Sequence, residues 1–117
     1  MLFPPYFYPS PLIMFAMLLL GHCLGDFPLQ GDFLAGAKNP RLSMQGVPWW
    51  IALTAHSIIQ AGIVGLVTGS LTFGIAEFLA HWIIDFAKCH NRFGFAFDQL
   101  LHVACKVIWI LCLACFA

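Results

Sequence analysis

Histidine and aspartate occur three times at a spacing of four residues within the hydrophobic stretches of this chain. The pairs are His22/Asp26, His81/Asp85 and Asp98/His102, and one further histidine, His56, stands alone. A spacing of four places both members of a pair on one face of a helix, one turn apart. Such side chains are costly in hydrocarbon and persist there when they pair, bind an ion or line a pathway. The helices that carry them should therefore turn these faces toward one another.

The composition predicts an integral membrane protein. Hydrophobic residues make up 62% of the 117 residues and charged residues only 9%, with a mean hydropathy of +0.90. A water-soluble domain of this length would not carry such a composition. The formal net charge is zero, so nothing indicates a nucleic-acid partner. We expect an all-α fold, a four-helix transmembrane bundle that forms a single domain over residues 1–117.

Four apolar segments have the length of a membrane span, about 20 residues. They cover residues 12–30, 48–68, 71–88 and 97–117. Gly69 and Ser70 alone separate the second segment from the third, so these two helices should form an antiparallel hairpin. No lysine or arginine precedes Lys38, which argues against a cleaved signal peptide and favours a mature helix for the first segment.

The basic residues predict how the chain is oriented in the bilayer. Lys38 and Arg41 fall between the first and second segments, and Lys88 and Arg92 between the third and fourth. Because basic loops stay in the cytoplasm, both loops should face it, with the termini outside the inner (cytoplasmic) membrane of a bacterium. The seven histidines and aspartates would then share one depth, in the cytoplasmic half of a multi-pass bundle.

This shared depth favours a metal site over separate structural contacts. A lone intramembrane histidine such as His56, or a single His/Asp pair, is explained as well by a hydrogen bond between helices. Seven convergent groups favour a metal, with a proton or ion relay as the alternative. Imidazole and carboxylate together suit Zn²⁺ best, then Fe²⁺ or Mn²⁺, rather than Mg²⁺ or Ca²⁺. Seven ligands exceed the three or four of one zinc site, so we expect one or two ions, unless some carboxylates only orient the histidines.

Other polar residues near these pairs have separate interpretations. Gln30 and Gln99 are candidates for positioning a substrate or a water molecule, and interfacial capping explains them equally well. Asp32 is expected at the interface and His90 in solvent. The five cysteines contain no CxxC motif and are expected to be free thiols, with Cys105 as a minor candidate for a soft metal ligand.

Two features concern the packing of the helices. Glu77 and Lys106 fall near the middle of the third and fourth segments, where an isolated charge would be costly, so we expect a buried ion pair. Glu77 is also one turn from His81, which leaves it open as a base or an extra ligand. Gly21 and Gly25 form a small-xxx-small pair that allows another helix to approach closely.

The candidate residues belong to a longer pattern, HxxxDFxxQ … H … HxxxD … DQxxH, which extends over nearly the whole chain. Its parts are the run Leu20–Gln30, His56, the run His81–Asp85 and the run Asp98–His102. In this pattern the chain resembles a family of small, multi-spanning membrane proteins of bacteria and phages that is catalogued as a domain of unknown function. The resemblance implies that these residues form one site, and it implies no established reaction.

The sequence as a whole predicts a metal-dependent membrane enzyme. We expect a hydrolase with a site open to the cytoplasm and a lipid-linked or membrane-proximal substrate, similar in chemistry to membrane-bound metal-dependent hydrolases. The expected metal ligands are His22, Asp26, His56, His81, Asp85, Asp98 and His102. Asp26, Asp85 and Asp98 are ligands or the general base.

Two alternatives and the oligomeric state stay open. The first alternative is a small ion- or proton-conducting membrane protein, and the second is a phage-related membrane partner with a structural metal. The outer halves of the segments are apolar, as in Ile63–Val67 and Ile108–Leu111, which favours a one-sided metal site over a conduction pathway. A homo-oligomer is compatible with all of these interpretations.

Overall fold

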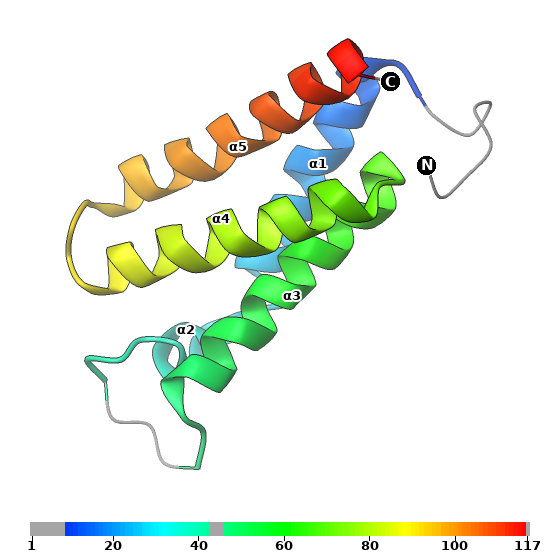
Figure 1. The fold of residues 1–117 in the computed structure, drawn as a ribbon. Coiled ribbons are helices and arrows are strands. Elements are labelled where there is room, and N and C mark those ends of the chain that lie inside the picture. Colours follow the sequence, from blue (N-terminus) through cyan, green and yellow to red (C-terminus); the bar gives the residue numbers. More distant parts are fainter. Residues whose placement is uncertain (1–8, 43–45, 117) are drawn as a thin grey trace.

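The computed structural model describes residues 9–42 and 46–116, which fold into five helices without a strand (Figure 1). The helices are α1 (Pro11–Asp26), α2 (Gly31–Ala37), α3 (Trp49–Thr68), α4 (Leu71–Cys89) and α5 (Phe95–Phe116). The four long helices pack in a ring, in the order α1, α3, α4, α5 and back to α1. The start of α1, the α3–α4 turn and the end of α5 lie at one end of this bundle (Figure 1).

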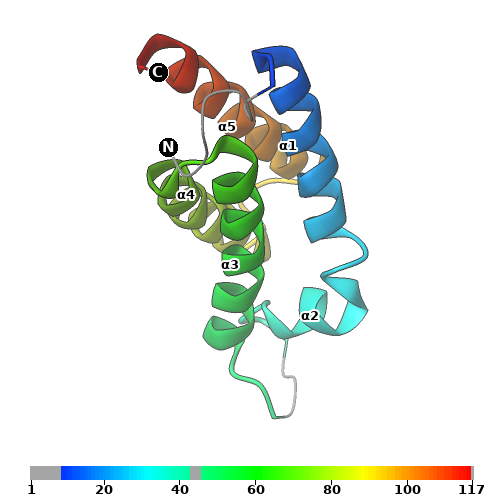
Figure 2. The ribbon, with the colours of Figure 1, turned by 90° about the vertical axis from the view of Figure 1, so that its right-hand side faces the viewer.

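The first segment differs from the predicted helix over residues 12–30. Helix α1 ends at Asp26 because Phe27 leaves the helical conformation, with φ −113° and ψ −82°. The next residue is Pro28, and a residue before proline is disfavoured in the α region. The chain then turns at Gly31, where φ is +65°, and enters the short helix α2. Helix α2 is bent by 81° from α1 and crosses the lower end of the bundle (Figure 2).

Two helices are long and apolar enough to cross a membrane. They are α3 over Trp49–Thr68 and α5 over Phe95–Cys115, and α1 with α2 adds a third if the bent pair counts as one broken span. Helix α4 carries three charged side chains, Glu77, Asp85 and Lys88, within its 19 residues. The length and apolarity of the helices therefore support two spans, or three with the bent pair, and do not confirm the predicted four.

Close approach of the helices depends on glycines. A Cβ atom at Gly74 would lie 3.2 Å from the carbonyl oxygen of Ala61 and 3.4 Å from the Cα atom of Gly65, so α3 and α4 touch through their backbones. A Cβ atom at Gly21 would lie 2.2 Å from Cγ2 of Ile63, so a side chain of α3 packs directly on the backbone of α1. Between α3 and α4, Gly69 makes the turn in the left-handed conformation, with φ +65°. The predicted hairpin and the predicted role of Gly21 are both confirmed.

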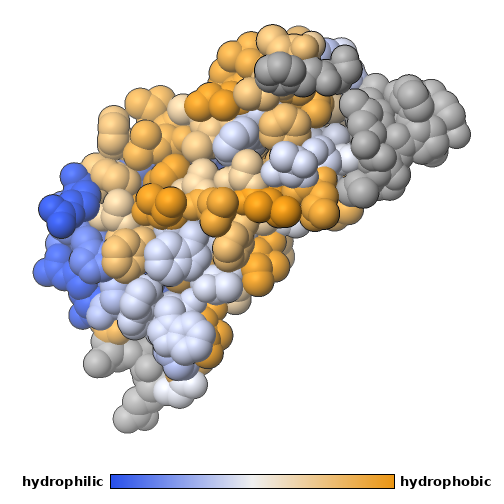
Figure 3. Space-filling model, in the orientation of Figure 1, coloured by the Kyte–Doolittle hydropathy of each residue, from blue (hydrophilic) through white to orange (hydrophobic). Residues whose placement is uncertain are grey.

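The interior of the bundle is polar and its exterior is apolar. The buried side chains include the four histidines His22, His56, His81 and His102, together with Gln60, Glu77 and Lys106. Exposed leucine, isoleucine and phenylalanine side chains lie on all five helices. Figure 3 shows hydrophobic residues along α4 and α5, and hydrophilic residues gathered where α4 connects to α5. This distribution is the reverse of that in a water-soluble domain.

The predicted ion pair between Glu77 and Lys106 is confirmed. The Lys106 ammonium donates to Oε1 of Glu77 at 2.5 Å, and each side chain is only 1% exposed. The indole nitrogen of Trp109 donates to the other carboxylate oxygen at 2.7 Å. Three groups from α4 and α5 thus neutralise and satisfy one another inside the bundle.

Replacing Lys106 by methionine should lower the free energy of unfolding by about 3–5 kcal/mol, because the Glu77 carboxylate would stay buried without its counter-charge. The double variant Glu77→Gln with Lys106→Met should recover much of this loss. Equilibrium unfolding in detergent micelles measures both effects. Strictly additive effects of the two substitutions would contradict a direct pair.

Candidate metal centre

Two histidines from the α3–α4 hairpin meet at the centre of the ring. Their Nε2 atoms, in His56 and His81, lie 3.0 Å apart. Oδ1 of Asp26, from the end of α1, lies 3.2 Å from the first of these nitrogens and 3.7 Å from the second. Ligands of a tetrahedral metal bound at about 2.0–2.1 Å are themselves about 3.3 Å apart. These three atoms therefore have the separations that one small cation requires.

Asp85 connects this group to the opposite side of the cluster. Its Oδ2 atom lies 3.4 Å from Nε2 of His56 and 3.5 Å from Nε2 of His81. Its Oδ1 atom lies 3.0 Å from Nε2 of His102 on α5. The two oxygens of one carboxylate thus face histidines on three different helices.

The remaining candidates extend the cluster between α1 and α5. Oδ1 of Asp98 lies 3.4 Å from Nε2 of His102. Nε2 of His22 lies 3.4 Å from Oδ2 of Asp26 and 3.0 Å from Oε1 of Gln99. The structure therefore brings all seven sequence-predicted residues into one connected cluster, as their spacing and depth indicated.

Three groups of side chains in this cluster could hold a metal ion, with ligand atoms within 4.8 Å of one another. They are Asp26/His56/His81, Asp26/Asp98/His102 and Glu77/His81/His102. Asp26 belongs to the first two. His22 and Asp85 belong to none of the three; His22 contacts Gln99, and Asp85 binds Lys38. Whether the seven residues hold a metal stays a prediction.

Several side chains contact the candidate ligands on the side away from the cluster or hydrogen-bond to them, and so fix their orientation. Oε1 of Glu77 lies 3.3 Å from Nδ1 of His81, which turns the Nε2 atom of that ring toward the cluster. Because Lys106 and Trp109 also bind this carboxylate, we assign Glu77 to the support of His81 rather than to the metal. Gln99 donates to Oδ2 of Asp26 at 3.0 Å. The amide of Gln99 thus holds the carboxylate of α1 against α5.

Two residues of the centre lay outside the sequence prediction. Gln60 is fully buried and donates to Oδ1 of Asp26 at 2.8 Å. It follows His56 by four residues, the spacing of the other pairs, so the signal was present. Lys38, predicted as a loop residue, is only 8% exposed and donates to Oδ2 of Asp85 at 2.6 Å. No sequence signal indicated this contact, because it depends on the break between α1 and α2.

The other polar candidates lie as follows. Gln30 donates to the backbone oxygen of Asp26 at 3.1 Å, which is a capping contact at the end of α1. His90 is exposed, as predicted, with Nδ1 2.9 Å from the oxygen of Phe86. All five cysteines are free thiols, and among the described residues none, Cys105 included, belongs to a group that could hold a metal.

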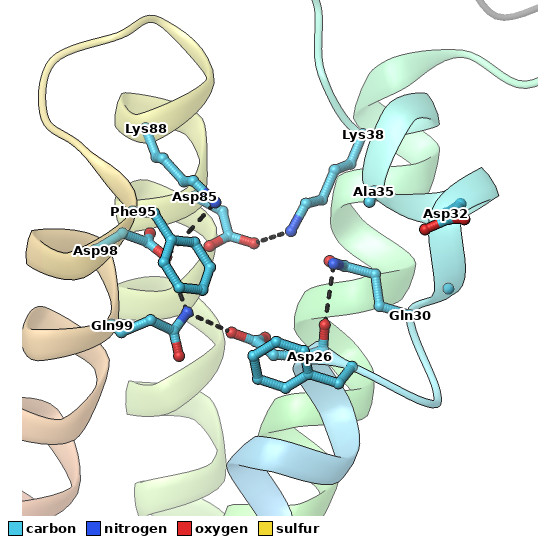
Figure 4. Close-up of a pocket in the computed structure, with 12 residues that line it drawn as sticks. Asp26, Gln30, Asp32, Ala35, Lys38, Asp85, Lys88, Phe95, Asp98 and Gln99 are labelled. Carbon is cyan, nitrogen blue, oxygen red and sulfur yellow. Dashed lines mark hydrogen bonds and ion pairs between the residues drawn. The ribbon is translucent and has the colours of Figure 1, made fainter.

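A cavity of about 340 Å³ borders the cluster at the end where α2 crosses the bundle (Figure 4). The three aspartates Asp26, Asp85 and Asp98 lie along one part of its wall. The cavity gives a small molecule access to the carboxylates, which an enclosed structural site would not.

The chain belongs to the family described as a protein of unknown function (DUF3307), whose model matches residues 14–116. The matched range contains all seven candidate residues, in agreement with the resemblance seen in their pattern. No curated protein and no solved structure matches the chain. The family description names no reaction, so a function has to be inferred from the geometry of the site.

Gly25 tests how the Asp26 carboxylate is held. A Cβ atom there would lie 2.4 Å from Nε2 of Gln60, the amide that donates to Asp26. Gly25→Ala should therefore lower the free energy of unfolding by about 1–3 kcal/mol, the cost of leaving buried polar groups without partners. Thermal and chemical unfolding in detergent measure this loss.

Gly62→Ala is the matched control, since nothing lies within 4 Å of its Cβ position. In a Gln60→Ala background the effect of Gly25→Ala should largely disappear, because the clashing amide is gone. Equal stability of the Gly25→Ala and Gly62→Ala variants would contradict the role of Gln60.

Proposed function

We propose that the chain is an integral membrane, metal-dependent hydrolase whose His/Asp centre opens to the cytoplasmic side. The observation that carries the proposal is the sharing of Asp26 by two ligand groups beside an accessible cavity. A structural metal needs closed coordination by protein ligands, whereas a catalytic metal needs a position that substrate or water can reach. The cavity next to Asp26, Asp85 and Asp98 supplies such a position.

The membrane part of the proposal rests on the distribution of polarity. A membrane-spanning helix bundle tolerates charged side chains when they face the interior of the bundle and pair with one another there. Glu77 and Asp85 of α4 are both buried and paired, so their charges do not prevent α4 from crossing a bilayer as a fourth span. The bundle would then be multi-pass, and we assign it to the inner membrane of a bacterium.

For the metal we propose Zn²⁺, with Fe²⁺ or Mn²⁺ as alternatives. One ion would be bound by Asp26, His56 and His81, and a second by Asp26, Asp98 and His102. Mixed imidazole and carboxylate ligation is typical of these metals. A carboxylate shared between two ions is the usual arrangement of dinuclear centres in helix bundles. A divalent ion held by these residues would polarise a substrate oxygen and lower the pKa of a bound water molecule.

Among the three aspartates, Asp98 is best placed to accept a proton. Its Oδ1 atom is buried and accepts no hydrogen bond from the described residues, and the side chain lines the cavity. Asp26 is bound by Gln60 and Gln99, and Asp85 by Lys38. We therefore propose Asp98 as a general base when only the Asp26/His56/His81 ion is bound, and as a metal ligand when the second ion is present. Asp26 would hold the metal in both cases, and Asp85 would orient His56 and His81, which its Oδ2 atom faces.

A proton or ion relay is the competing function. The polar interior continues beyond His81 to Glu77 and Lys106, which a relay would use. Farther toward the α3–α4 turn, the buried side chains include Met14, Leu18 and Val64. An apolar barrier of this kind favours a one-sided site over a continuous pathway.

His81→Ala tests the metal directly. It removes a ligand of the Asp26/His56/His81 ion, so the affinity for zinc should fall by more than the ~10–100-fold that loss of an orienting partner costs. Elemental analysis of the detergent-purified protein measures the bound metal. His90→Ala is the control, because His90 is exposed and outside the ligand groups.

Equal metal content in these two variants would contradict the assignment. Purified protein that carries no stoichiometric transition metal, and conducts ions in liposomes, would favour the relay instead.

The proposed orientation has a separate test. In whole cells, a membrane-impermeant thiol reagent should label a cysteine placed at Ser70 and leave one placed at Pro40 unlabelled, with the parent protein as the background measurement. Labelling of both positions, or of Pro40→Cys alone, would overturn the orientation.

A further inference from the structure

Two lysines line the same cavity as the aspartates, and each lies beside one of them. Lys38 reaches in from the end of α2 and Lys88 from the last turn of α4, and their side chains converge on the same space (Figure 4). We propose that this cavity binds the phosphate group of a phosphate ester and presents it to the His/Asp centre. The inference rests on the proposed function and specifies its substrate class.

The charge of the cavity wall would suit an anionic ligand once both proposed ions are bound. Four carboxylates, Asp26, Asp32, Asp85 and Asp98, face two ammonium groups, which leaves two negative charges. Two divalent cations would turn this into two positive charges. A phosphate monoester near neutral pH carries about −1.5 to −2 and offers three acceptor oxygens. Its charge therefore matches that of the cavity with both proposed ions bound.

Lys38 is placed to exchange its present partner, the Asp85 carboxylate, for an anion bound in the cavity. Its ammonium donates to Oδ2 of Asp85, the same oxygen that faces His56 and His81. A cation bound by this oxygen would repel the ammonium and compete for its lone pairs. Since Lys38 is only 8% exposed, the nearest polar surroundings of the displaced ammonium are those of the cavity. An anion bound there would restore the lost ion pair.

Lys88 is held loosely at the other side of the cavity. Its ammonium lies 3.9 Å from Oδ2 of Asp98 and 5.0 Å above the ring of Phe95, and its side chain is 34% exposed. An ammonium with a long contact can move toward a ligand at little cost. Gln30 adds a buried Oε1 atom on the cavity wall that has no hydrogen-bond partner among the described residues and can accept from a hydroxyl of the ligand.

The size of the cavity fits a headgroup. About 340 Å³ lies near the lower limit of small-molecule sites, enough for a phosphate and a few further atoms but not for acyl chains. The side chains of Phe27, Leu29 and Phe33, around the α1–α2 break, are all more than half exposed. They offer apolar surface to the chains of a lipid. A phosphate on a lipid and a phosphate on a soluble ester share the chemistry that the lysines recognise.

Hydrolysis of such an ester requires no further reactant. The oxygen of water forms a bond to phosphorus, the bond from phosphorus to the ester oxygen breaks, and that oxygen takes one proton of the water. The products are an alcohol and inorganic phosphate.

The test measures binding of inorganic phosphate to zinc-loaded protein in maltoside micelles, which contain no phosphate of their own. Lys38→Met and Lys88→Met should each weaken phosphate binding at least about tenfold, the effect of losing a charge-assisted hydrogen bond. Arg92→Met, which removes an exposed cation outside the cavity, should change it less than about twofold. Lys88→Met serves if Lys38→Met fails to fold, because Lys88 is partly exposed.

Zinc content measured on the same samples separates the two proposals. The phosphate site is wrong if the zinc content is normal but the parent protein does not bind phosphate. It is also wrong if Lys88→Met, with normal zinc, binds phosphate as tightly as the parent protein. Either result leaves the metal site standing. Protein that binds neither zinc nor iron nor manganese would overturn the proposed function and this inference with it.

Competition then identifies the source of the phosphate. Displacement of inorganic phosphate by phosphatidic acid supports a lipid headgroup, and displacement by glycerol 3-phosphate supports a soluble ester. If neither compound displaces it, the ligand is not a phosphate ester and the inference is wrong.

Discussion

The carboxylate of Asp26 is the group on which the four long helices converge. It contacts His22 on its own helix, His56 and Gln60 on α3, His81 on α4 and Gln99 on α5. Asp26 is also the last residue of α1, so the break that follows it starts from the centre of the bundle. Because the helix stops there, α2 folds across the end of the bundle and brings Lys38 to Asp85. The cavity and the position of Lys38 in its wall both follow from this one helix end.

The polar interior makes stability and function depend on the same contacts. In surroundings of low dielectric constant, each buried charge needs a partner, and removal of one partner leaves the other at high cost. Glu77 illustrates this dependence, since its carboxylate pairs with Lys106, binds Trp109 and orients His81. A substitution far from the cavity can therefore change the geometry at the proposed metal. Comparisons of variants should for this reason measure folding and metal content together.

Sequence periodicity was sufficient to predict the cluster but not its surroundings. The four-residue spacing fixed which faces of three helices meet, and the shared depth of Glu77 and Lys106 predicted their ion pair. Both predictions depend only on helix geometry, which local sequence determines. The helix break at Phe27–Pro28 was missed because the apolar run continues through it, so hydropathy outweighed the effect of proline. The position of Lys38 depends on that break and on tertiary packing, which no pattern in the chain encodes.

The central claim is a buried centre in which imidazole and carboxylate groups bind zinc. X-ray absorption at the zinc edge of the purified protein tests this claim most directly. The account predicts a first shell of nitrogen and oxygen at about 2.0–2.1 Å with the scattering pattern of imidazole. With both sites filled, a second metal should lie at about 3.5–4 Å. A shell of sulfur at about 2.3 Å, which would place the metal on the cysteines, or the absence of stoichiometric metal would contradict it.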